Sequence, residues 1–121
     1  MAKILLIDDD PDMRQLISAA LNKEGFSVTT VSRKQEALQK IIEDKPSVVL
    51  LDVLLSGDDG RDLCREIKAN AATQHIPVIM LSGHPAAAVK IESCGADDFL
   101  AKPFSTQELL SRLHRRMDIR E

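Results

Sequence analysis

The sequence predicts an α/β fold in which a parallel sheet carries helices on both faces, as one domain over residues 1–121. Short apolar runs alternate five times with stretches that have apolar residues at helical spacing. This alternation is typical of a parallel sheet with crossover helices. The run Val48–Leu51 contains no polar residue, which indicates a central strand buried on both faces. A chain of 121 residues is large enough for one real core.

The first half of the chain predicts two strand–helix units. Lys3–Ile7 is an apolar strand, and Asp10-Pro11 after it is typical of a helix start with Asp as the N-cap. Gly25 is expected to end this helix, whose buried face would carry Met13, Leu16, Ile17, Ala20 and Leu21. Residues 26–29 alternate as in a strand near an edge. Ser32 and Gln35 predict the capping box of a second helix. Its buried stripe would be Ala37, Leu38, Ile41 and Ile42.

The second half predicts three more units. The central strand ends at Asp52, and the third helix is marked by Leu63, Cys64 and Ile67. A fourth strand over residues 76–81 runs out at Ser82 and precedes a weakly amphipathic helix over residues 86–93. The fifth strand, residues 98–101, ends at Lys102. Ser105 with Glu108 predicts the capping box of the last helix, which is lined by Leu109, Leu110, Leu113 and Met117.

Composition and charge narrow the classes of function. The three aromatic residues are all Phe and the formal net charge is -3, which argues against direct nucleic-acid binding. Cys64 and Cys94 lack metal-ligand spacing and are interpreted as free thiols of a reducing compartment. No apolar run approaches the roughly 20 residues that a membrane span needs. We therefore expect a cytoplasmic protein that makes no membrane contact.

Side chains that can bind ions or react chemically follow the predicted strands at their carboxyl ends. Asp8 and Asp9 follow the first strand, Asp52 ends the third, Ser82 follows the fourth and Lys102 the fifth. Right-handed crossovers favour a flavodoxin-like (βα)5 sheet of order 2-1-3-4-5, which brings the first and third strands together. Carboxylates crowded there repel one another unless a cation is bound, and oxygen ligands favour Mg²⁺. Asp52 can then act as a nucleophile towards a phosphoryl group, with Lys102 and Ser82 donating to its oxygens.

At this point the chain resembles the receiver domain of bacterial two-component response regulators. The resemblance covers essentially the whole chain and lies in the acidic pair and Asp52, Ser82-Gly83, Lys102-Pro103-Phe104, and the glycine at position 60. It implies that Asp52 accepts a phosphoryl group from the phosphohistidine of a sensor histidine kinase or phosphotransfer protein. The phosphorylated domain would then act on an output domain or partner protein. Such a domain is not an enzyme beyond its own phosphorylation and slow dephosphorylation.

The resemblance also implies roles around the phosphoryl group. Asp9, Asp52 and the backbone carbonyl of Leu54 would bind Mg²⁺, with Mn²⁺ as a substitute. Asp8 would act mainly through water, and Lys102 would contact the phosphoryl oxygens.

A conformational switch is implied as well. Ser82 would move toward the phosphoryl group and Phe99 would turn inward, so that phosphorylation shifts the domain to an active state. The Lys102–Pro103 bond is expected to be cis. The fourth helix, fifth strand and fifth helix would form the surface that partners read, and a phosphorylation-dependent dimer could form there.

Three positions depart from the family pattern. Ser56 stands where the family usually has proline, so the loop after Asp52 would be less rigid. Leu54 and His84 occupy the two positions that tune dephosphorylation in the family. Leu54 cannot orient an attacking water, so we expect slow self-dephosphorylation. His84 either handles that water or is an exposed loop histidine.

Two other interpretations fit part of the sequence. A magnesium-dependent phosphatase of the haloacid-dehalogenase type would use Asp8 as its nucleophile, within the acidic run Asp8-Asp9-Asp10. The chain is short for that fold. A receiver fold that docks partners without being phosphorylated would need no acceptor, and the intact set of site residues argues against it.

Overall fold

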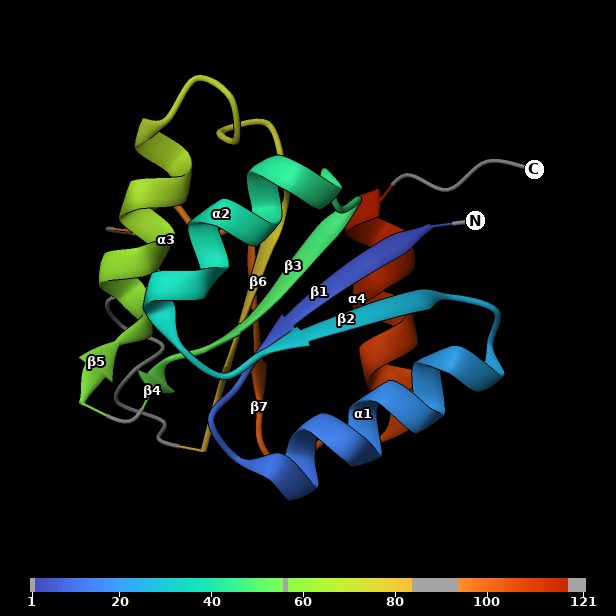
Figure 1. Cartoon of the computed structure of the whole chain (residues 1–121). Coiled ribbons are helices and arrows are strands. Elements are labelled where there is room, and N and C mark those ends of the chain that lie inside the picture. Colours follow the sequence, from blue (N-terminus) through green and yellow to red (C-terminus); the bar gives the residue numbers. More distant parts are fainter. Residues whose placement is uncertain (1, 56, 84–93, 118–121) are drawn as a thin grey trace.

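The computed structural model describes residues 2–55, 57–83 and 94–117, which form a parallel sheet flanked by helices (Figure 1). The sheet contains β1 (Lys3–Ile7), β2 (Ser27–Val31), β3 (Val48–Asp52), β6 (Val78–Ser82) and β7 (Asp98–Ala101). The strand order is β2-β1-β3-β6-β7, and all neighbouring pairs are parallel. Counted along the chain within this sheet, the order is the predicted 2-1-3-4-5. The fold class is therefore confirmed.

Helices cover both faces of the sheet. They are α1 (Pro11–Lys23), α2 (Lys34–Asp44), α3 (Gly60–Ala69) and α4 (Thr106–Met117), and Figure 1 shows α1 and α4 on one face, with α2 and α3 on the other. Each face has its own buried apolar cluster. Ile4 and Leu6 of β1 contribute to the cluster under α1 and α4, and Leu5 and Ile7 to the cluster under α2 and α3. This division follows from the two-residue repeat of a strand.

The central strand is buried along its whole length, as its apolar sequence predicts. Every residue of β3 is buried, including Asp52 at its end. The strand β2, by contrast, lies at an edge and is at least partly exposed at every residue except Val31, and it begins one residue later than predicted. Burial on both faces explains why β3 carries no polar residue before Asp52.

Two helix starts follow the sequence prediction. The side chain of Asp10 accepts hydrogen bonds from the backbone of Asp12 and Met13 and so caps α1. Ser105 and Glu108 form the reciprocal bonds of a capping box before α4, both at 3.1 Å. These contacts join residues close in sequence, which is why the sequence pattern alone was sufficient to predict the two helix starts.

The predicted capping box at α2 is wrong. The helix begins at Lys34 with Arg33 as its N-cap, and no side-chain hydrogen bond caps it. Gln35 is therefore the second helical residue, one position short of the place from which a capping-box side chain reaches back. Ser32 instead lines an open cavity described below.

Two predicted core residues are exposed. Leu16 of α1 and Ile42 of α2 have exposed fractions of 66 % and 47 %. In each helix the buried residues are four apart, Ile17 and Leu21 in α1 and Ala37 and Ile41 in α2. Leu16 and Ile42 each adjoin one of these in sequence, about 100° around the helix, and so leave the buried face.

The segment after β3 differs from the predicted loop. Leu54–Leu55 (β4) and Asp58–Asp59 (β5) form a short antiparallel pair. The predicted helix over residues 86–93, and with it Ser56 and His84, lies outside the described residues. In the part of the chain that the structure describes, no helix is long and apolar enough to span a membrane.

Gly60 lets α3 start directly against the end of β3. Its backbone N–H donates to the carbonyl oxygen of Val53 at 2.6 Å. A Cβ atom at this position would collide with the carbonyl oxygen of Asp52, which is backbone and cannot rotate away. A side chain here would therefore push the helix off the strand that carries Asp52.

We predict that Gly60→Ala destabilises the domain by about 1–3 kcal/mol, the usual cost of forcing extra volume into a packed site. Urea unfolding in the presence of a chelator measures the change. Gly83→Ala is the matched control, because among the described residues a Cβ there would meet only the Cβ of Lys102, at 4.0 Å. Equal stability of the two variants would contradict the prediction.

Candidate functional site

Three carboxylates meet at the carboxyl edge of the sheet. Asp8 and Asp9 follow β1, and Asp52 ends the neighbouring β3. A carboxylate oxygen of each lies within 4.8 Å of the others. Asp8 is fully buried, Asp52 is 8 % exposed and Asp9 is half-buried. The predicted convergence of the acids is therefore present, and only Asp9 has substantial access to solvent.

Lys102 compensates the two buried acids. Its Nζ lies 3.2 Å from Oδ2 of Asp8 and 3.4 Å from Oδ2 of Asp52. Its backbone N–H donates to the carbonyl oxygen of Ser82 at 2.7 Å, and the Lys102–Pro103 peptide bond is cis. Because Lys102 follows β7, its side chain has to reach past β6 to bring this ammonium group to β3.

The loop that carries Asp8 is held by several hydrogen bonds. The backbone N–H of Asp10 donates to Oδ1 of Asp8 at 2.9 Å, and the backbone N–H of Asp8 donates to the carbonyl oxygen of Val31. Nη1 of Arg14 donates to the carbonyl oxygen of Asp8 at 2.8 Å. Sequence analysis did not single out Arg14. The sequence feature that could have identified it is an arginine in the first turn of the helix that follows the acidic run.

Burial raises the pKa of Asp52 to about 6, from an ordinary value of 3.8. The positive charge of Lys102 lowers this pKa and the negative charge of Asp8 raises it, so the two neighbours oppose each other. The backbone N–H of Leu54 donates to Oδ1 of Asp52 at 3.3 Å and favours the charged form. The ionised Asp52 is thus incompletely compensated, as expected of an acid placed to receive a cation.

Ser82 and Phe99 lie on the same face of the sheet. Ser82 is buried at the end of β6, and Phe99 of β7 pairs with Met80, two residues before Ser82. Residues two apart in a strand point to the same side. Phe99 is half-buried and packs against the cluster under α2 and α3. The two residues predicted to move together therefore share one face of adjacent strands, two residues apart in register.

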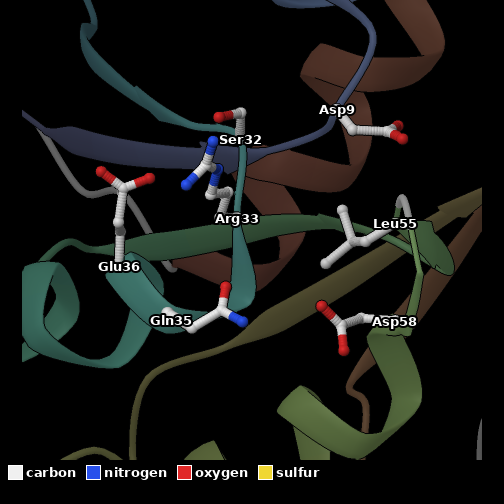
Figure 2. A pocket seen from close by; sticks show the side chains of 7 residues that line it. All are labelled: Asp9, Ser32, Arg33, Gln35, Glu36, Leu55 and Asp58. Atoms are coloured by element: carbon white, nitrogen blue, oxygen red, sulfur yellow. The ribbon is translucent and has the colours of Figure 1, made fainter.

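An open cavity of about 660 Å³ lies beside the acid cluster (Figure 2). Asp9 belongs to both, and the opposite walls come from the start of α2 and from the β4–β5 pair. The lining residues are Asp9, Ser32, Arg33, Gln35, Glu36, Leu55 and Asp58. Leu54 lies at the same pair of strands and is 52 % exposed. The acids can thus be approached from solvent at this side.

Residues 4–114 match the family profile of the response regulator receiver domain. The chain belongs to this family. As a receiver domain it is a signalling module that accepts a phosphoryl group, and not a classical enzyme. Receiver domains bind Mg²⁺ at an acidic pocket, and Asp8, Asp9 and Asp52 form an acidic cluster here. The family match gives no support to the phosphatase alternative.

Several known proteins are similar to this receiver domain. The transcriptional regulatory protein GltR of Pseudomonas aeruginosa is 41 % identical over 112 residues, and the phosphate regulon regulator PhoB of the same organism is 38 % identical over the same length. These stretches cover 91 % of the chain but only 46 % and 49 % of the two regulators. The chain therefore spans about half the length of these relatives.

Solved receiver structures share the fold. The receiver domain of the sensor histidine kinase PA1611 of P. aeruginosa, solved with a magnesium ion coordinated in its active-site cleft, is 30 % identical with a TM-score of 0.90. The alignment covers 98 % of both chains. The chemotaxis protein CheY4 of Vibrio cholerae is 30 % identical with a TM-score of 0.89, over 96 % of this chain and 98 % of that one.

The raised pKa of Asp52 predicts a pH-dependent gain in stability for Asp52→Asn without divalent cations. The pKa of Asp52 in the folded state, about 6, exceeds its ordinary value of 3.8. The charged carboxylate therefore lowers the stability of the folded state above about pH 6, and this penalty is absent below about pH 4, where the group is protonated in both states. We expect the variant to melt several degrees higher near pH 8, with the gain vanishing near pH 4. Thermal unfolding with a chelator at both pH values measures it.

Asp10→Asn is the matched control for this prediction. Asp10 is an exposed neighbour of the same acidic run, and Asn caps a helix about as well as Asp. Its melting temperature should change little at either pH. A lower melting temperature for Asp52→Asn near pH 8 would show that the pairing with Lys102 outweighs burial.

Proposed function

We propose that Asp52 is the phosphoacceptor of this receiver domain. The observation that carries the proposal is the position of Asp52: it lies at the end of the fully buried β3, 3.4 Å from the ammonium group of Lys102 and within the cluster of acids. Asp8 is fully buried and engaged by Lys102 and by the N–H of Asp10. Asp52 is thus the better placed of the two to act as a nucleophile.

In the proposed reaction, a carboxylate oxygen of Asp52 attacks the phosphorus atom of a phosphohistidine. The P–N bond breaks, the imidazole leaves with the bonding electrons, and an acyl phosphate remains on Asp52. Lys102 and Ser82 donate hydrogen bonds to the phosphoryl oxygens. The ammonium of Lys102 is already within 4 Å of Asp52, so little of its motion has to be restricted for catalysis.

The residues at the edge of the sheet fit a magnesium ion. The donor set is all oxygen and contains no His or Cys, as Mg²⁺ prefers. We assign Asp9, Asp52 and the backbone carbonyl of Leu54 as its ligands, with Asp8 acting through water, and Mn²⁺ as a substitute. When bound, the ion neutralises negative charge on the phosphoryl group and the carboxylates.

Phosphorylation acts on Ser82 and Phe99 through a shift in population. The phosphoryl group adds about -1.5 to -2 charge, and only a state that brings Ser82 and Lys102 onto its oxygens gains from it. Phe99 is half-buried on the same face as Ser82, so a movement of Ser82 can be matched by a movement of this ring.

The surface formed by β7 and α4 is the described part of the proposed readout face. Asp98 of β7 is within 4 Å of the guanidinium groups of Arg112, Arg115 and Arg116 on α4. Burial raises the pKa of Asp98, but hydrogen bonds from Phe99 and Arg116 and the arginine charges outweigh it, so the net pKa is lowered. This charged surface would contact an output domain, a partner protein or a second copy.

The donor would be a sensor histidine kinase or a phosphotransfer protein in the cytoplasm. Cys64 and Cys94 form no disulfide in the structure, which agrees with a reducing compartment. The longer regulators GltR and PhoB support an output through a further domain. Direct contact of the receiver domain with nucleic acid or membrane is not part of the proposal.

Labelling with acetyl phosphate tests the assignment of Asp52. With Mg²⁺, the wild-type chain should gain the mass of one phosphoryl group, and peptide mapping should place it on Asp52. Asp52→Asn should gain none, and a chelator should abolish labelling of the wild type. Asp8→Asn should still be labelled on Asp52, more slowly. Labelling of Asp8 would contradict the proposal, and failure to modify the wild type would favour phosphorylation-independent docking.

Leu54 predicts a long-lived acyl phosphate. Its side chain is 52 % exposed beside Asp52 and carries no group that can hydrogen-bond an attacking water. We predict that Leu54→Asn shortens the phosphoryl lifetime by roughly tenfold, because an amide can position that water. Loss of the phosphoryl mass with time measures the rate. Leu16→Asn, at another exposed leucine, is the control, and equal lifetimes in both variants would refute the role of Leu54.

A further inference from the structure

Two cysteines of the core have no role in the phosphotransfer. Cys64 lies on α3, and Cys94 lies 30 positions later, just before β7. Neither forms a disulfide in the structure, both are buried, at 0 % and 3 % exposure, and both belong to the cluster under α2 and α3. Packing of the core does not by itself require cysteine at these two positions, because another small apolar residue could fill either of them.

The two cysteines are in direct contact. The thiol of Cys64 donates to the carbonyl oxygen of Cys94 at 3.4 Å. The thiol of Cys94 is itself a hydrogen-bonding neighbour of the Cys64 thiol. Two side chains so placed need to change mainly their side-chain torsions to bring the sulfur atoms to bonding distance, whereas distant cysteines would require the backbone to move.

We propose that Cys64 and Cys94 form a reversible intramolecular disulfide when the domain meets a peroxide. The thiolate of Cys94 attacks one peroxide oxygen, the O–O bond breaks, and a sulfenic acid and a hydroxide result. The hydroxide takes up the proton that the Cys94 thiol released on ionisation and becomes one water. The sulfur of Cys64 then attacks the Cys94 sulfur, the S–O bond breaks, and the hydroxide leaves as a second water with the thiol proton. The two thiols are oxidised to one disulfide, and the peroxide is reduced to two waters.

Cys94 is assigned the first step because it keeps slight exposure while Cys64 has none. Burial raises the pKa of the Cys64 thiol, so its thiolate is scarce and the reaction has to be slow. Both sulfurs become accessible only when this part of the core opens locally. The pair would therefore respond to sustained oxidation rather than to a brief pulse.

The bond would join two parts of the domain that the proposed switch uses. The helix α3 begins at Gly60, against the carbonyl of Asp52. Cys94 leads through Gly95 into β7, which carries Phe99. A disulfide would fix α3 to the segment that leads into β7. It would also close a long loop of the unfolded chain, which stabilises the folded state relative to the unfolded state.

The experiment treats the wild-type chain with hydrogen peroxide under native conditions, followed by non-reducing digestion and mass spectrometry. We expect a peptide pair cross-linked through Cys64 and Cys94, a monomeric protein, and complete reversal by dithiothreitol. The melting temperature of the oxidised form should rise by about 5 °C or more. The peptide map of the wild type decides the question without any variant.

Cys94→Ala and Cys64→Ala are the matched controls. Either should lose the cross-linked peptide and the rise in melting temperature, and oxidation of the remaining cysteine should stop at sulfur oxygenation. Three results with the wild type would overturn the proposal. They are thiols that remain reduced after prolonged exposure, sulfinic acid at either cysteine without a cross-link, and disulfides that join two chains instead of two residues of one chain.

Discussion

The ammonium group of Lys102 allows two buried carboxylates to occupy one edge of the sheet. Buried carboxylates without a partner are costly, and Asp8 and Asp52 share this cation at 3.2 and 3.4 Å. Lys102 does not fully compensate the negative charge of Asp52, since burial still raises the pKa of Asp52 well above its ordinary value. The site is thus stable enough to fold and still electrostatically prepared for a further cation. Both properties come from placing one positive charge against three negative ones.

The fold supplies the positions on which this balance depends. Parallel pairing brings the ends of β1 and β3 together, and the absence of a side chain at Gly60 lets α3 start at the carbonyl of Asp52. Arg14 fixes the acidic loop from α1. None of these contacts touches a phosphoryl group. They keep Asp52, the proposed phosphoacceptor, at a defined place, which is the main requirement for phosphoryl transfer by positioning and charge.

The sequence predicted what depends on local or strongly periodic signals. The apolar run before Asp52 identified the central strand, and Asp10-Pro11 and Ser105 with Glu108 identified helix starts. It failed where tertiary packing decides: α2 starts one residue late, Leu16 and Ile42 face solvent, and Leu54–Leu55 pairs with Asp58–Asp59. The acids and Lys102 could be placed at one edge from topology. Their distances, and the role of Arg14, depend on side-chain directions that no spacing encodes.

One residue joins three strand ends. Lys102 reaches β1 and β3 through its side chain and β6 through its backbone, which bonds to Ser82. Any new anion that draws this ammonium group toward itself alters its attachments to β1 and β3 in the same event, while the backbone bond to Ser82 keeps Lys102 beside β6. In the proposed switch, the phosphoryl group and the first groups that respond to it would therefore lie within one side chain's length, without a long relay through the core. A domain of this small size can for that reason respond as a unit to chemistry at a single carboxylate.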